Sequence, residues 1–166
     1  EEELSLEDLL GVTNYYYTKP QPDKLVAVLK VLIRREDFVN DAKVSSPFGH
    51  FIATVAHRDF MFLNLLKSLR DQNFGLSKIF LQNIVNEAEA FLSPTPDTQN
   101  NLNYLWGEFI ATGDKEPVMK IISVLGYSAN ETNASLIEWT ESSLILNAYH
   151  HTKVYEFVKE AFALSS

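Results

Sequence analysis

The sequence contains no cysteine, which excludes disulfides, thiolate nucleophiles, zinc ribbons and iron–sulfur clusters. Basic residues are also few: 14 Lys and Arg against 22 Asp and Glu leave a net charge of −8. Because nucleic-acid binding uses Lys and Arg to neutralise phosphates, we expect no nucleic-acid partner. No apolar run reaches the ~20 residues that cross a bilayer, so we expect no transmembrane segment in this chain.

The common catalytic motifs are missing as well. The sequence has no GxSxG or SxxK nucleophile motif, no phosphate-binding loop ending in GK[ST], and no HExxH metal motif. The two carboxylate pairs, Glu87/Glu89 and Glu138/Glu141, are typical of solvated helix faces. We therefore expect a protein without catalytic residues, cofactor or bound metal, and favour a non-enzymatic role.

What the sequence does contain is typical of a folded protein. Hydrophobic residues make up 46% and charged residues 22% of the 166 positions, which is enough for one domain with a sizeable core. Apolar residues recur at helical spacing almost throughout, and strand-like alternation does not appear. After a short first helix capped by Ser5, helices are predicted at about 22–35, 46–56, 60–73, 77–91, 98–113, 115–125, 133–147 and 152–162.

Several local signals define these predicted helices. Ser46-Pro47 is predicted to start one helix, and Ser77 is predicted to cap another. Glycines at helix ends, such as Gly113, suit the left-handed conformation that terminates a helix. The residues predicted to face the core include Phe60, Leu146 and Phe162.

The clearest break is the loop at residues 93–97, which contains Pro94 and Pro96. It separates a front section (4–93) from a back section (97–166), after a frayed start at 1–4. A break this short is typical of a loop between packed elements, so we expect a single all-helical domain. Short turns favour antiparallel helix hairpins, stacked as a short right-handed tetratricopeptide-like superhelix or as an irregular bundle of eight or nine helices.

Histidines are the first candidates for a functional site. His50 and His57 lie seven residues apart on one predicted helix, roughly 10 Å from each other, which is too far for one metal ion. Partial burial or a helix-end position explains them more simply than ligand binding. His150 and His151 are predicted to lie in the turn between the last two helices, where a cationic His150 suits the C-terminus of the preceding helix. A weak surface metal site is the alternative for this pair.

The run Tyr15-Tyr16-Tyr17 is the most unusual local feature. Three consecutive aromatic residues cannot all face one side of an element, so at least one should be exposed or should cover a neighbouring helix. An aromatic contact patch is one interpretation, since Tyr is frequent at interfaces. The other is a first helix held to the core by two of the tyrosines. Trp106, together with these tyrosines and the histidines, completes the residues that could line a binding cavity.

Three segments resemble a family of small bacterial all-helical proteins of uncharacterised function: YYTKP (16–20) with the helix that follows it, SPFGHFIA (46–53) and YLWGEFIATGD (104–114), together with residues 142–154. Many members of that family carry an export or lipoprotein signal. The resemblance implies a periplasmic or envelope location, with the signal removed before Glu1 and a membrane tether upstream as one possibility; a cytoplasmic location is the alternative. It implies no catalytic residues.

These observations together predict a non-enzymatic helical module that binds a protein or peptide partner in the bacterial envelope. The alternative is an enzyme or small-ligand protein with a cavity between helices, lined by His50, His57, Trp106 or the tyrosines.

Overall fold

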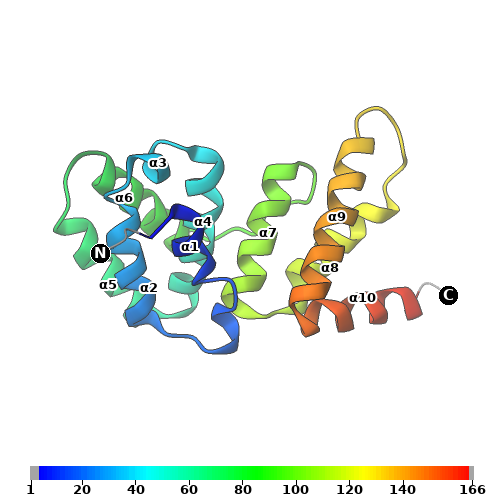
Figure 1. Ribbon diagram of the computed structural model, residues 1–166, viewed down its shortest axis with the longest axis horizontal. Helices are drawn as coiled ribbons and strands as arrows, with labels where there is room; N and C mark the ends of the chain where they lie inside the picture. Colours follow the sequence, from blue (N-terminus) through cyan, green and yellow to red (C-terminus); the bar gives the residue numbers. More distant parts are fainter. Residues whose placement is uncertain (1–3, 165–166) are drawn as a thin grey trace. The chain divides into compact units, whose positions relative to one another are not determined.

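The computed structural model describes residues 4–164, and within that range the chain is all-helical, with no β-strand (Figure 1). The predicted all-α class is therefore confirmed. The frayed start predicted for residues 1–4 lies outside the described residues except for Leu4, whose carbonyl oxygen accepts a hydrogen bond from Arg35 Nη1 (2.6 Å). The elements are α1 (Leu6–Gly11), η1 (Tyr16–Thr18), α2 (Pro22–Leu32), α3 (Glu36–Val39), α4 (Ala42–Arg58), α5 (Phe60–Asp71), α6 (Gly75–Glu89), α7 (Gln99–Thr112), α8 (Lys115–Ser123), η2 (Val124–Gly126), α9 (Ala134–His150) and α10 (Thr152–Leu164).

The helices form two compact units, each described here by itself. The first comprises residues 1–92 and the end of α7 at 110–112; the second comprises residues 93–109 and 113–166. The boundary between Leu92 and Ser93 coincides with the start of the proline-containing loop that the sequence marks as its clearest break. Whether the two units make one domain, and whether their helices stack as in tetratricopeptide proteins, stay predictions.

In the first unit the core lies among α4, α5 and α6, which pack most extensively on one another. Aromatic rings occupy its centre. Phe38 is fully buried and makes edge-to-face contacts with Phe48 (ring centroids 5.7 Å apart) and Phe80 (5.4 Å). Edge-to-face pairs are favourable because the positive ring edge meets the negative face. The aromatic residues therefore supply much of the apolar area that stabilises this unit.

The structure differs from the sequence prediction at the start of α4. The predicted start at Ser46-Pro47 is wrong: α4 begins at Ala42, and Asp41 caps it by accepting a hydrogen bond from Lys43 N–H (3.1 Å). Pro47 lies inside the helix, where it removes one backbone hydrogen bond. A cap with a well-placed carboxylate and a strongly buried helix offset that loss. The stretch between the helices predicted at 22–35 and 46–56 also contains the one-turn helix α3. This helix accounts for one of the ten α-helices described, against the eight or nine expected.

Two further differences concern the first turns of α5 and α6. Phe60 is 71% exposed whereas Phe62 is fully buried, because Asp59 caps α5 and places Phe60 at the first helical position, off the buried stripe. Ser77 is not a cap but lies in the first turn of α6, where its hydroxyl donates to the Ile33 carbonyl (2.8 Å). Gly75, in the left-handed region at φ +60°, begins that helix.

The second unit is built from α7 to α10. Apolar residues buried in it include Leu102, Leu105, Phe109, Val118, Ile121, Val124, Leu136, Leu144 and Val154. Thr98 caps α7 by accepting from Asn101 N–H. Gly113 ends the helix at φ 69°, as the sequence signal predicts. The left-handed residue at this position lets the chain reverse into α8 within two residues.

We expect Phe38→Ala to lower the free energy of unfolding by about 3–5 kcal/mol, because it removes a fully buried ring and both of its edge-to-face contacts. Urea denaturation followed by circular dichroism measures the change. Phe74→Ala is the matched control, since Phe74 is 85% exposed and its loss should change stability by no more than about 0.5 kcal/mol. Equal effects of the two substitutions would contradict this account of the core.

Candidate functional site

Helix α9 buries one narrow stripe and leaves other apolar residues uncovered. Leu136, Thr140 and Leu144 repeat every fourth position and are all buried. The Thr140 hydroxyl donates to the Leu136 carbonyl (2.7 Å), so this polar group is satisfied within the helix. Ile145 and Leu146 follow the stripe directly and are 74% and 58% exposed, so the prediction that Leu146 faces inward is wrong.

Helix α10 turns away from the end of α9 (Figure 1) and packs on α8 and α9. His151 has extended backbone (φ −129°, ψ 111°), which ends α9 and redirects the chain. The His151 ring packs edge-to-face on Phe109 (5.3 Å), and Val154 is fully buried where α10 packs on α8 and α9. Lys115 and Glu160 form an ion pair between the start of α8 and α10.

These two helices enclose an open groove of about 270 Å³. The ~150 Å³ of a cavity that holds one benzene-sized group is about half of this volume. Ile145 on one wall and Phe162 on the other are exposed by 74% and 58%, which corrects the prediction that Phe162 faces the core. The groove is lined by Leu125, Glu141, Leu144, Ile145, Ala148, Val158 and Phe162.

The lining of the groove is mostly apolar. Six of its seven lining residues are apolar, and Glu141 is the single titratable side chain among them. One carboxylate at the edge of an apolar surface can orient an occupant and select its charge, whereas proton transfer coupled to bond cleavage needs a second reacting group within reach.

The structure brings the two predicted histidines together through a third ring. Phe91 stacks on both imidazoles, with ring centroids 5.5 Å from His50 and 4.7 Å from His57. His50 is buried and its Nδ1–H donates to the Glu87 carboxylate, a partner from α6 that spacing along α4 did not predict. His57 is exposed, and its Nδ1–H donates to the Ala88 carbonyl (3.1 Å). Both rings thus tie α4 to the end of α6.

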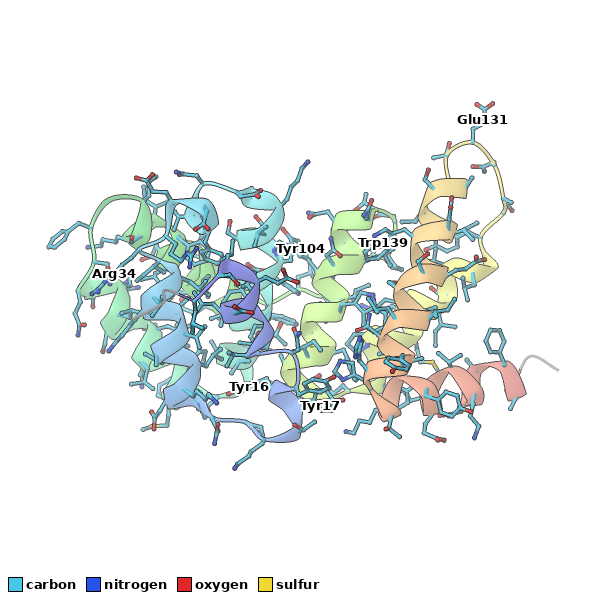
Figure 2. All side chains as sticks on the ribbon, viewed as in Figure 1. Tyr16, Tyr17, Arg34, Tyr104, Glu131 and Trp139 are labelled. Atoms are coloured by element: carbon cyan, nitrogen blue, oxygen red, sulfur yellow. The ribbon has the colours of Figure 1, made fainter. Side chains whose placement is uncertain are left out.

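The three consecutive tyrosines divide between surface and core, as their spacing predicts. Tyr15 is 48% exposed, while Tyr16 and Tyr17, labelled in Figure 2, are half-buried around η1. Tyr16 packs edge-to-face on Phe51 of α4 (5.7 Å). Tyr15 and Tyr16 also line a small cavity of about 90 Å³ between η1 and α2. Holding the N-terminal segment to the core accounts for Tyr16, and the contact-patch role of Tyr15 stays a prediction.

Trp106 of α7 has a structural position. It is buried, its Nε1–H donates to the Ser143 hydroxyl of α9 (3.2 Å), and its ring meets Phe109 edge-to-face (6.2 Å). A buried indole whose N–H is satisfied in this way joins α7 to α9. None of the six residues predicted as binding candidates lines the groove.

Sequence reasoning also missed a polar chain at the loop before α7. The Ser93 hydroxyl donates to Glu108 Oε1 (2.8 Å) and accepts from Lys120 Nζ (2.9 Å). Glu108 is buried, and the serine links this buried acid to a lysine of α8. With its hydroxyl engaged on both sides, Ser93 serves to fasten the loop to two helices. Because Ser93, Glu108 and Lys120 lie far apart in the sequence, no local pattern predicts that they meet.

A second, more open depression of about 420 Å³ lies between the α2–α3 turn and the start of α6. Its most prominent charges are Arg34, labelled in Figure 2, and Arg35. Arg35 already makes two hydrogen bonds to the Asp37 carboxylate (3.0 and 2.8 Å), and its pairing lowers the pKa of Asp37. A guanidinium committed to an internal partner has little left for an external anion, so this depression is the weaker candidate.

Within residues 4–164, no three His, Asp or Glu side chains gather closely enough to hold a metal ion. In the same range, every helix is too short or too polar to cross a bilayer.

Comparison with protein-family models, with curated proteins and with solved structures found no match to this chain. The geometry therefore carries the functional argument, and the resemblance to bacterial helical proteins stays a prediction.

Tyr16 provides a test of the first unit, because burial and, secondarily, the Asp59 carboxylate raise the pKa of its hydroxyl to about 12. In a rapid-mixing titration of tyrosinate absorbance, we expect a late ionisation step near pH 12 that Tyr16→Phe removes. Tyr15→Phe is the matched control and should leave the late step in place. Because burial also raises the pKa of Tyr17, the contradicting result is a late step that keeps its full amplitude in Tyr16→Phe.

His151 provides a test of the second unit. Burial, and secondarily the adjacent His150, lower the pKa of His151 from 6.5, so the unfolded chain takes up this proton first on acidification. The stabilising contribution is complete above pH 6.5 and is lost as the pH falls through the folded-state pKa. Between about pH 7.5 and about pH 5.5, the stability of His151→Phe, measured by thermal unfolding, should therefore fall less than that of the parent chain. His150→Gln should keep most of the parent's loss, and an unchanged slope in His151→Phe would rule out this assignment.

Proposed function

We propose that this chain is a non-enzymatic binding module that holds an α-helical segment of a partner protein in the groove between α9 and α10. The observation that carries the proposal is the groove itself, with Ile145 and Phe162 exposed on opposite walls. Exposed apolar side chains gathered in a groove are typical of interaction sites. Covering them releases about 25 cal/mol for each Å² of apolar surface removed from water.

The shape of the groove favours a helical segment over a small molecule. It lies between α9 and α10, with Leu125 of η2 also lining it. Its volume of about 270 Å³ lies just below the roughly 300–1,000 Å³ of typical ligand pockets. A volume of this size suits two or so bulky side chains presented at i and i+3 or i+4 by an amphipathic helix. A groove open along its length also lets the rest of that helix continue outside.

The alternative function, an enzyme or small-ligand protein, has less support. Its titratable groups lie elsewhere: His50 and Glu87 in the contact between α4 and α6, and Ser93 with Glu108 and Lys120 at the loop before α7. In both places the polar atoms satisfy one another. That arrangement stabilises the fold.

For the place of action, we propose the bacterial cell envelope, with the cytoplasm as the alternative. The support is the resemblance carried by the segment that includes Trp106, Phe109 and Gly113-Asp114. Fractionation of cells that make the native protein decides between the two, because recovery with the cytosolic fraction would exclude an envelope location.

The groove is tested with a fluorescein-labelled peptide of about 14 residues, long enough to form a helix, with leucines on one face. Fluorescence polarisation should detect binding, and Ile145→Glu should weaken it by at least about tenfold, since it places a charge in an apolar contact. Ile79→Glu is the matched control, because Ile79 is a 57% exposed isoleucine on α6. Binding should be unchanged in that variant. If no peptide of this kind binds, or if both variants bind equally, the proposed function is wrong.

A further inference from the structure

The groove has an acidic edge. Glu138 and Glu141 lie one turn apart on α9, both are exposed, and the spacing of Glu138, Glu141, Ile145 and Tyr149 places the four on one face of the helix. Within residues 4–164, neither carboxylate makes an ion pair or a side-chain hydrogen bond. This exposed face of α9 therefore presents two carboxylates, followed by Ile145 (74% exposed) and Tyr149 (86% exposed).

Basic side chains do little to neutralise this edge. Helix α9 contains no Lys or Arg, and its one basic side chain is that of His150 in the last position. On α10, Lys159 lies over the Tyr155 ring (5.3 Å) and within 4.0 Å of Glu156, while Lys153 donates to the Gly113 carbonyl (3.4 Å). Both lysines thus already have partners other than Glu138 and Glu141. The net charge of −8 adds a long-range attraction for cations.

Glu141 discriminates among possible occupants because it lines the groove itself. A purely apolar helix would cover the carboxylate without offering a partner, which costs free energy since a charge removed from water needs compensation. An acidic helix would add repulsion. A Lys or Arg beside the apolar residues would pair with the carboxylate and keep its charge satisfied as water leaves.

From this charge complementarity we infer that the occupant is a cationic amphipathic α-helix, and this inference rests on the proposed function. Its apolar side chains enter the groove between Ile145 and Phe162. A Lys or Arg one turn away along the partner helix pairs with Glu141, and Glu138 extends the acidic edge to a second basic residue. An anionic lipid surface does not fit, because the same two carboxylates would repel it.

The test compares three labelled peptides that share one leucine face and carry Lys, Gln or Glu beside it. With the parent chain, the Lys peptide should bind at least about threefold more tightly than the Gln peptide, and the Glu peptide should bind most weakly. Raising the salt concentration should narrow the difference, because exposed ion pairs are screened.

Charge reversal locates the effect. Glu141→Lys should weaken binding of the Lys peptide by about three- to tenfold and should strengthen binding of the Glu peptide. The matched control is Glu131→Lys, which makes the same change in net charge at the tip of the loop before α9 (Figure 2). It should shift both affinities by less than about twofold, since a distant exposed charge is largely screened.

The outcomes separate the two proposals. If all three peptides bind equally and Ile145→Glu weakens them, the groove binds helices but the inference about charge is wrong. If Glu131→Lys acts as strongly as Glu141→Lys, the effect comes from net charge and the inference is also wrong. Binding to vesicles with anionic lipid, or self-association of the chain that Ile145→Glu abolishes, would replace the cationic helix with another occupant. If no peptide binds, both proposals fail.

Discussion

The anchoring of the first turn of α10 is the constraint on which the groove depends. Val154 is fully buried against α8 and α9, His151 packs on Phe109, and Lys153 reaches the carbonyl of Gly113. With these contacts made, α10 leaves the end of α9 so that Val158 and Phe162 line the groove together with Ile145. The apolar surface between the two helices is open, with Ile145 and Phe162 exposed by 74% and 58%.

The first unit shows a different arrangement, in which polar and aromatic groups join α4 to the end of α6. Phe91 lies against His50 and His57 at once, and each imidazole donates its Nδ1–H to an acceptor on α6. A buried polar ring is stable there because its hydrogen-bonding capacity is used, whereas an unpaired one would cost the full desolvation penalty. His50 and His57 thus act as links between α4 and the end of α6.

Local signals in the sequence were reliable where a single residue decides the backbone. Thr98 at the start of α7 and Gly113 at its end have the positions that capping rules predict. Pro47 was misleading because a proline suits a first turn but is tolerated deeper in a helix that is otherwise well capped and buried. Phe60 was wrongly predicted to be buried because the apolar pattern of α5 allows two phases, and Asp59 as cap selects the one that buries Phe62.

The groove could have been noticed only in part from sequence. Ile145, Leu146 and Tyr149 depart from the spacing of Leu136, Thr140 and Leu144, which marks surplus apolar surface on α9. Nothing in the sequence shows which of those residues a neighbouring helix covers, because burial depends on the direction of α10. Glu87 beside His50, and Ser93 between Glu108 and Lys120, are equally invisible, since their partners are far apart along the chain.

By itself, the sequence determined the all-α class, most helix positions, the break before α7 and the absence of thiol chemistry, because these follow from composition, periodicity and local backbone preference. Tertiary structure alone decided which apolar residues stay exposed, which polar groups satisfy one another and where a carboxylate meets an open apolar groove. Those outcomes depend on contacts between helices distant in sequence, and a one-turn change in the phase or direction of one helix would alter them without changing any local pattern.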